Sequence, residues 1–285
     1  MWALVPAYRA ASLVGNPFRA APSAPRDLHV EDVGFVAADG VRLAGWLVRG
    51  RAAAPAIVLV PGFKDDRRLM VSWAQFLNAA GYSVLLLDRR GCGASDGWAI
   101  ALGAREQDDV IGAARYLRTR LGDAPIGVLG VSLGALRAQR PLPLGIAIRA
   151  AAADPSIAAV VADSAWTDQD FQLDRLRTVR VGGVDVPLLP YAEPLVDAIA
   201  GADVRAIARP LDAIGRLTDT QAVFLIHSID DANATTPPSG AAALFAAAHE
   251  PKQEWLTTGG HIGAINAHPD EYRDRVLAFF TRYLR

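Results

Sequence analysis

The stretch Ile126-Gly127-Val128-Leu129-Gly130-Val131-Ser132-Leu133-Gly134-Ala135 lies near the middle of the chain and decides its fold. It is an apolar run that leads into Gly-x-Ser-x-Gly and then into residues that tolerate a helix. This order predicts a buried strand, a tight turn at Ser132 and a following helix. Gly130 and Gly134 carry no side chain, so strand and helix can approach closely. Such a turn would present the Ser132 hydroxyl above the sheet, with the Leu133 N–H at a helix N-terminus.

Apolar runs alternate with helical patterns on both sides of this stretch. Asp39-Gly40 lies between the first two strands and predicts a hairpin. The alternation predicts an α/β fold, with a mostly parallel, doubly wound sheet covered on both faces. Strands are expected at 33–37, 41–48, 56–60, 83–87, 126–131, 158–162, 221–227 and 254–256. Helices are expected around Trp73 to Leu77, at 106–121, from Ser132 to about Gln139, at 146–153, 239–248 and 272–284, with a break at 141–145 caused by Pro141 and Pro143.

The chain divides into an N-terminal arm at 1–28 and one large domain at 29–285. From about 164 to 217 the pattern loosens and prolines interrupt it, which predicts a helical cap inserted over the carboxyl edge of the sheet. The arm is expected to be loosely packed. The alternative is a membrane-surface helix that uses Trp2, Leu4, Val5 and Tyr8.

Composition narrows the classes of function. The chain has 285 residues, 52% of them hydrophobic and 21% charged, and a net charge of −1, which argues against a nucleic-acid-binding protein. A single cysteine, Cys92, excludes an internal disulfide. The N-terminal residues lack the apolar core of a signal peptide and are too interrupted to span a bilayer, so no stable membrane insertion and a cytoplasmic location are expected. The oligomeric state cannot be predicted.

Polar residues follow three of the expected strands. In chain order they are Ser132, then Asp230-Asp231, then His261. Because ligands meet a doubly wound sheet at the carboxyl ends of its strands, this order suggests a serine nucleophile, a carboxylate and a histidine base. The chain order alone leaves open whether Asp231 or Asp230 supplies the carboxylate, and Asp163 is a further alternative. The pentapeptide alone would be equally compatible with a glycine-rich turn that carries an incidental serine.

Several motifs together resemble the α/β-hydrolase superfamily, in particular bacterial esterase-like members with a helical cap. They are Asp39 to Trp46 in the entry hairpin, Pro61-Gly62-Phe63, the loop from Asp88 to Gly97, the Ser132 turn, Ile226-His227 followed by Asp231, and Gly260-His261. The resemblance implies hydrolysis of a small-molecule carboxylic ester with a small or medium acyl group. It implies an acyl-enzyme on Ser132, with His261 as base and Asp231, four residues past His227, as the expected acid. It also implies an oxyanion hole from the N–H groups of Phe63 and Leu133, and no cofactor or metal.

The chain departs from the family pattern in four places. Pro61 stands where His-Gly is usual, Cys92 stands where histidine is usual, Pro141 breaks the segment after the nucleophile, and two extra residues precede Pro237. Pro61 and the proline break leave open a non-catalytic scaffold of the same fold. A peptidase or another acyl-bond hydrolase of the same fold is the other alternative.

Other candidate residues have more modest expected roles. Trp166 and Phe171 are candidates to line an acyl pocket, although cap aromatics also serve as packing. His268 is expected to be a surface residue, and Cys92 is not expected to be a nucleophile. Asp88 and Asp96 are expected to cap the glycine-rich loop between them.

Overall fold

A computed structural model of the chain describes residues 4–17, 19–131, 145–165, 178–187, 192–206, 209–233 and 236–285. The strands are β1 (Glu31–Val36), β2 (Arg42–Val48), β3 (Ala56–Val60), β4 (Ser83–Asp88), β5 (Ile126–Val131), β6 (Ile157–Asp163), β7 (Thr178–Val181), β8 (Val184–Pro187), β9 (Ala222–Ser228) and β10 (Lys252–Thr257). The helices are α1 (Leu4–Val14), the 3-10 helix η1 (Arg67–Met70), α2 (Val71–Ala79), α3 (Glu106–Leu121), α4 (Ile146–Ala153), α6 (Ala192–Ala200), α7 (Pro210–Ile214), α8 (Pro238–Ala247), α9 (Ala264–Ala267) and α10 (Pro269–Tyr283).

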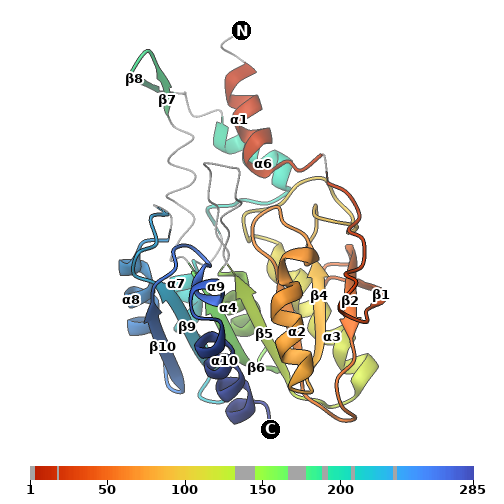
Figure 1. Cartoon of the computed structure of the whole chain (residues 1–285). Coiled ribbons are helices and arrows are strands. Elements are labelled where there is room, and N and C mark those ends of the chain that lie inside the picture. Colours follow the sequence, from red (N-terminus) through yellow and green to blue (C-terminus); the bar gives the residue numbers. More distant parts are fainter. Residues whose placement is uncertain are drawn as a thin grey trace.

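One eight-stranded sheet forms the centre of the molecule, in the order β1-β2-β4-β3-β5-β6-β9-β10 (Figure 1). β1 and β2 form the expected antiparallel hairpin, and β2 also pairs antiparallel with β4. From β4 to β10 every pairing is parallel. The predicted α/β class, the entry hairpin and the mostly parallel sheet are therefore confirmed.

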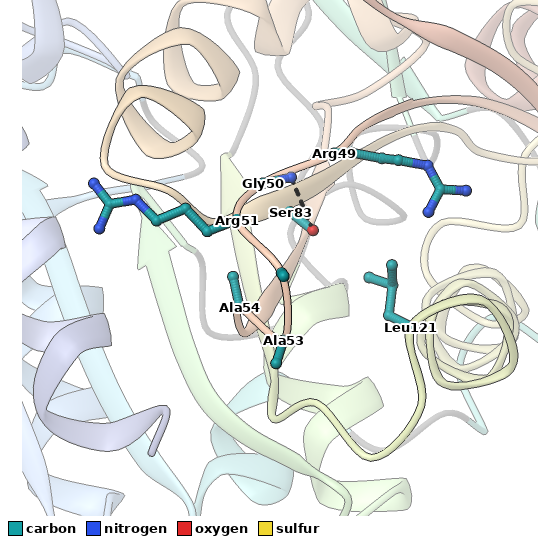
Figure 2. Close-up of a pocket in the computed structure, with 8 residues that line it drawn as sticks. Arg49, Gly50, Arg51, Ala53, Ala54, Ser83 and Leu121 are labelled. Atoms are coloured by element: carbon teal, nitrogen blue, oxygen red, sulfur yellow. Dashed lines mark hydrogen bonds between the residues drawn. The ribbon is translucent and has the colours of Figure 1, made fainter.

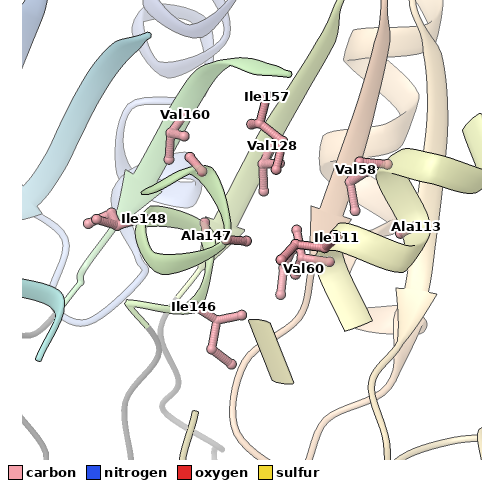
Figure 3. Packing of buried hydrophobic residues seen from close by; sticks show 14 of the residues in the cluster. Val58, Val60, Ile111, Ala113, Val128, Ile146, Ala147, Ile148, Ile157 and Val160 are labelled. Atoms are coloured by element: carbon pink, nitrogen blue, oxygen red, sulfur yellow. The ribbon is translucent and has the colours of Figure 1, made fainter. Parts of the chain in front are cut away.

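Helices cover both faces of the sheet, because its central strands are apolar on both sides. On one face, α3, α4, α7 and α8 pack against β3, β5, β6 and β9. Figure 3 shows part of this layer, where Ile146 and Ala147 of α4 and Ile111 of α3 meet Val60 and Val128. The opposite face is covered by α2, which packs against β4, and by α10, which packs against β6 and, through Phe279, against Phe224 of β9. Burial on both faces explains why these strands consist of unbroken apolar runs.

Gly130, near the end of β5, allows a helix to pack closely against the strand, as its lack of a side chain predicted. A Cβ atom at this position would lie 3.0 Å from the Cβ atom of Ala147 in α4. That distance is tighter than ordinary van der Waals contact, so glycine permits α4 to lie close to the central strand. The helix in this contact is α4. The helix expected directly after Ser132 lies within residues 132–144, outside the described part of the chain.

The carboxyl edge of the sheet contains a topological switch point. The chain passes from β3 to β4 on one side and then to β5 on the other side of β3. In doubly wound sheets, ligands bind in the crevice at such a point. The register is Val60 opposite Gly130 and Val131 opposite Asp163, so the segments that follow β3, β5 and β6 leave the sheet at about the same level.

The N-terminal segment differs from the expectation of a loosely packed arm. Residues 4–14 form helix α1, which packs against α6 beyond the ends of the strands (Figure 1). Ala10, Leu13 and Val14 are buried against Val196 and other apolar residues of the same cluster. The expectation was wrong because the apolar side of α1 finds its partner about 180 residues later in the chain. Leu4 and Tyr8 of the alternative expectation are exposed.

The segment predicted as a helical cap contains more than helices. Helix α6 is present, but β7 and β8 form a separate antiparallel hairpin with Gly182 and Gly183 at its turn. The guanidinium of Arg9 in α1 donates a hydrogen bond to the carbonyl of Thr178 at 3.1 Å, which connects α1 to this hairpin. α7 instead packs against α4 and α8. The division into arm, domain and cap remains a prediction.

Candidate active site

Asp231 and His261 lie together at the carboxyl edge of the sheet. Asp231 follows β9, and His261 follows β10, the neighbouring parallel strand. His261 Nδ1 is 2.7 Å from Asp231 Oδ2. The Asp231 side chain is 0% exposed and the His261 side chain is 11% exposed, so solvent and ligands can reach the ring but not the carboxylate. Loops after adjacent strands thus bring together two residues that are thirty positions apart in the chain.

Thr236 contacts both members of this pair, and no sequence motif predicted its role. Its hydroxyl donates to Asp231 Oδ2 at 2.8 Å and lies 3.0 Å from His261 Nδ1. Since that hydroxyl proton is directed to the carboxylate, both oxygens near Nδ1 act as acceptors. We therefore assign the imidazole proton to Nδ1, which leaves Nε2 as the basic nitrogen. The amide nitrogen of Asn233 lies 3.4 Å from both ring nitrogens.

The electrostatics of Asp231 favour a carboxylate. Burial raises its pKa, but the hydrogen bond and the charge of His261, together with the Asn233 N–H and the Thr236 hydroxyl, hold the pKa below its ordinary value. His227 lies 3.9 Å from the same oxygen, and burial lowers its pKa. A buried carboxylate that is ionised at neutral pH can orient an imidazole and stabilise its protonated form.

Asp230, the alternative acid, occupies a different position. Its carboxylate is exposed and accepts the backbone N–H groups of Gly259 and Gly260, each at 3.0 Å. These bonds lower the pKa of Asp230. Among the described contacts, the carboxylate that reaches His261 is that of Asp231. Asp230 stabilises the turn from which His261 projects.

Asp163, the second alternative acid, belongs to a buried network behind the candidate site. One carboxylate oxygen accepts the Tyr272 hydroxyl at 3.0 Å, and that hydroxyl accepts the indole N–H of Trp73 at 2.9 Å. The other carboxylate oxygen accepts the Ser164 hydroxyl at 3.0 Å. Ser164 Oγ in turn accepts the backbone N–H of Ile262 at 3.1 Å. The network therefore holds the residue next to His261, and its members come from segments that no local motif connects.

Replacement of Asp163 by asparagine tests the state of this network. Burial raises the pKa of Asp163 from 3.8 to about 6, although the hydrogen bonds from Ser164 and Tyr272 lower it. Because the folded state binds this proton more tightly than the unfolded state, the stabilisation present below pH 4 is lost as the pH rises from about 4 to about 6. Asparagine does not titrate, so the variant should gain stability relative to wild type as the pH rises, by about 2 kcal/mol between pH 4.5 and pH 7 out of a full effect of about 3 kcal/mol. Urea denaturation of both proteins at pH 4.5 and pH 7 measures this; an unchanged difference would contradict it.

Phe63 lies on the loop that follows β3, at the switch point described above. Gly62 is buried, and Phe63 and Lys64 are half-buried. Lys64 has a positive φ of 58°, and the Asp65 N–H donates to the Gly62 carbonyl at 3.2 Å, which closes a tight turn. The Lys64 ammonium donates to the carbonyl of Ser12 at 2.8 Å, near the C-terminal end of α1. The N-terminal helix thus contacts the loop that carries Phe63.

The glycine-rich loop after β4 is organised around Asp88. Its carboxylate accepts the N–H groups of Arg67 and Ala94, both at 2.8 Å, which confirms its capping role. Gly93 has a φ of +48°, and a Cβ there would lie 2.0 Å from the carboxylate. Asp96 differs from the expectation. Its carboxylate forms an ion pair at 2.9 Å with the guanidinium of Arg42 in β2, because the backbone N–H of Asp96 bonds to that residue's carbonyl and places the side chains together.

Cys92 and His268 lie outside the candidate chemistry. Burial raises the pKa of the Cys92 thiol to about 11, so it is protonated at neutral pH. His268 Nε2 lies 2.9 Å from the Thr258 hydroxyl, and the ring packs edge-on against Trp255.

Four of the predicted site residues lie outside the described residues. They are Ser132, Leu133, Trp166 and Phe171. The expected break at 141–145 also falls outside the described residues, except for Gly145. What the structure does place is Val131, the last residue of β5, opposite Asp163 of β6. The position of Ser132 therefore rests on its being the next residue after the central strand.

A cavity of about 270 Å³ lies on the opposite edge of the sheet, near the amino ends of β3 and β4. Ala54 and Ser83 are among its lining residues. The guanidinium groups of Arg49 and Arg51 point in opposite directions, away from each other (Figure 2). They do not converge on a ligand position. Within the described ranges, no cluster of three or more His, Cys, Asp or Glu side chains is arranged to hold a metal ion, and no helix has the length and apolar content to cross a membrane.

Comparison with known proteins identifies the family. The model of the alpha/beta hydrolase family matches residues 57–275, which is more than half of the chain. The chain therefore belongs to the alpha/beta hydrolase family, as its motifs had suggested.

Individual relatives are more distant. The thiohydrolase aneE of Aspergillus aculeatus is 36% identical over 106 residues, which cover 35% of this chain and about a third (33%) of that protein. The polyketide transferase grgF of a Penicillium species is 22% identical over 295 residues, which cover 89% of this chain and 96% of that protein. Among solved structures, the esterase Pf2001 of Pyrococcus furiosus is similar with a TM-score of 0.73 and 23% identity, covering 95% of this chain and 100% of that one. These similarities agree with the fold described above.

Proposed function

We propose that the protein is a serine hydrolase that cleaves carboxylic esters through an acyl-enzyme, with Ser132 as nucleophile, His261 as general base and Asp231 as the acid that orients the base. The observation that carries the proposal is the 2.7 Å contact between His261 Nδ1 and Asp231 Oδ2 at the carboxyl edge of the sheet. Ser132 follows the central strand at the same edge. The chain order Ser-Asp-His agrees with this family.

In the proposed reaction, Ser132 Oγ attacks the acyl carbon while His261 Nε2 accepts its proton. The negative charge on the carbonyl oxygen is stabilised by the N–H groups of Phe63 and Leu133. When the tetrahedral intermediate collapses, the C–O bond to the leaving group breaks and His261 returns the proton to the alcohol. A water molecule then repeats the sequence on the acyl-enzyme, which releases the acid and restores Ser132. Asp231 remains ionised throughout, in agreement with its lowered pKa.

Thioester cleavage is a second candidate activity. Its support is the partial sequence identity to a protein named a thiohydrolase, and the lower identity over most of the chain to one named a polyketide transferase. The same nucleophile and base would serve, because esters and thioesters react through the same acyl-enzyme.

A panel of matched substrates tests the proposal. We would compare p-nitrophenyl esters of increasing acyl length with the N-acetylcysteamine thioester and the p-nitroanilide of the preferred acyl group. The proposal expects kcat/KM for ester or thioester to exceed that for the anilide by orders of magnitude. A preference for the anilide would favour a peptidase. No turnover of any of the three, together with no reaction with a fluorophosphonate, would favour a non-catalytic scaffold.

A further inference from the structure

Arg89 is a buried cation with no assigned role in the proposed reaction. It follows β4 and is 0% exposed. Its Nη2 donates to the carbonyl oxygen of Gly62, whereas Nε and Nη1 have no hydrogen-bond partner in the part of the chain that the structure describes. Burying a guanidinium with unsatisfied donors costs free energy. The bond to the Gly62 carbonyl is the hydrogen bond that Arg89 makes among the described residues, and its charge also acts on the carboxyl of Asp65, whose pKa it lowers against the raising effect of burial.

Together with the Asp65 N–H, which also donates to the Gly62 carbonyl, the contact holds the orientation of one peptide group. The Gly62 carbonyl and the Phe63 N–H belong to the same peptide unit, and the cis bond recorded among the described residues is Glu250-Pro251. In a trans peptide the C=O and the N–H point in opposite directions. Because Arg89 binds the carbonyl, the Phe63 N–H points away from Arg89.

The Phe63 N–H is also free to bind a ligand. It donates to no other residue that the structure describes. The loop leaves β3 at the level where β5 ends, since Val60 lies opposite Gly130. A cation on the carbonyl side also polarises the peptide and strengthens the N–H on the other side as a donor.

We infer that Arg89 is a positioning residue for the oxyanion hole, which orients and polarises the Gly62-Phe63 peptide so that its N–H faces the developing negative charge. The inference rests on the proposed function, and Arg89 itself does not touch the substrate. The Gly62 carbonyl would keep a partner without Arg89, because the Asp65 N–H also donates to it at 3.2 Å. The guanidinium is therefore not needed to satisfy this carbonyl.

The test compares two buried arginines that each donate to a glycine carbonyl. Arg89→Met removes the proposed effect. Arg149→Met is the matched control, because Arg149 is 5% exposed and donates to the Gly103 carbonyl at 2.6 Å and to Gln107. For each variant we would measure kcat and KM for a p-nitrophenyl ester and the inhibition constant of a trifluoromethyl ketone with the same acyl chain, which forms an oxyanion on the nucleophile. Thermal unfolding of all proteins reports on folding.

Arg89→Met should lower kcat by roughly 10- to 100-fold, somewhat less than the loss of an oxyanion donor outright. The affinity for the ketone should fall by a similar factor, while KM changes by less than about threefold because the ground-state ester carries no full charge on its oxygen. Arg89→Lys retains the charge and a donor, so it should recover part of the loss. Arg149→Met should leave the kinetics and the ketone affinity near wild type.

Wild-type ketone affinity in Arg89→Met would overturn the inference, and so would a fall in kcat that the ketone affinity does not follow. If Arg89→Met does not fold, Arg89→Gln takes its place and undiminished ketone affinity there would overturn the inference equally. A wild-type protein that neither hydrolyses ester nor binds the ketone would overturn the proposed function together with this inference. An active wild type with an equally active Arg89→Met would overturn this inference alone.

Discussion

Replacement of Ser132 by alanine is expected to abolish ester turnover. Without the nucleophile no acyl-enzyme forms, so at most the acceleration of about 10³–10⁴-fold over water that binding and the oxyanion hole supply would remain. Folding should persist, because the change removes only one hydroxyl group. Steady-state kinetics with the preferred p-nitrophenyl ester, alongside thermal unfolding, measure both effects.

Ser228→Ala is a matched control for this variant. Ser228 also lies at the carboxyl end of a strand, β9, and its hydroxyl is buried without a hydrogen-bond partner in the described part of the chain. Its removal should leave kcat within about threefold of wild type. If Ser132→Ala retained near-normal turnover, Ser132 would not be the nucleophile.

The second large effect is expected for His261→Ala. Nucleophile and base act as a unit, so the loss of the base should lower kcat about as much as the loss of Ser132. Wild-type kcat/KM should fall with a slope near one as acid protonates Nε2, because only the neutral ring can accept the serine proton. That acid limb should be missing from the residual activity of the variant. Activity measured between pH 5 and pH 9 tests this.

His268→Ala provides the comparison for the base. His268 contacts Thr258 and Trp255. No hydrogen bond among the described residues joins it to Asp231 or Thr236. Its removal should preserve both the rate and the acid limb. If His268→Ala removed the limb and His261→Ala did not, the assignment of the base would be reversed. A profile without a limb in the wild type would argue against a histidine base, provided that chemistry limits the rate.

Much of the fold could be predicted because its signals are local. The helix from 106 to 121 was predicted with the bounds that α3 has, and the strand predicted from 126 towards Ser132 is β5. A parallel strand buried on both faces is an unbroken apolar run, and an amphipathic helix has its own period. The pairing of Asp231 with His261 was predictable for a related reason, because residues that follow parallel strands meet at one edge.

Features that depend on distant partners could not be predicted in this way. The burial of α1 requires α6, and the expected strand 254–256 is longer, at Lys252–Thr257, because β9 offers it a parallel partner. The roles of Thr236 and Ser164 likewise come from contacts between loops that are far apart in the chain. None of these residues has a distinctive motif around it.

One missed element did have a local signal. The hairpin of β7 and β8 has two glycines between short strands that each begin and end with threonine, valine or proline, and two-residue glycine turns are typical of hairpins. A helical cap was predicted here, although the paired glycines at 182 and 183 favour a hairpin.

The most direct test of the central claim is the site of a covalent adduct. Wild-type protein would be treated with a fluorophosphonate, and the modified peptide would be mapped by tandem mass spectrometry. The account predicts one adduct per chain, on Ser132, formed in step with the loss of ester turnover and much more slowly in His261→Ala. An adduct on another residue that accompanies the loss of activity, or full ester turnover in protein that carries no adduct, would contradict it.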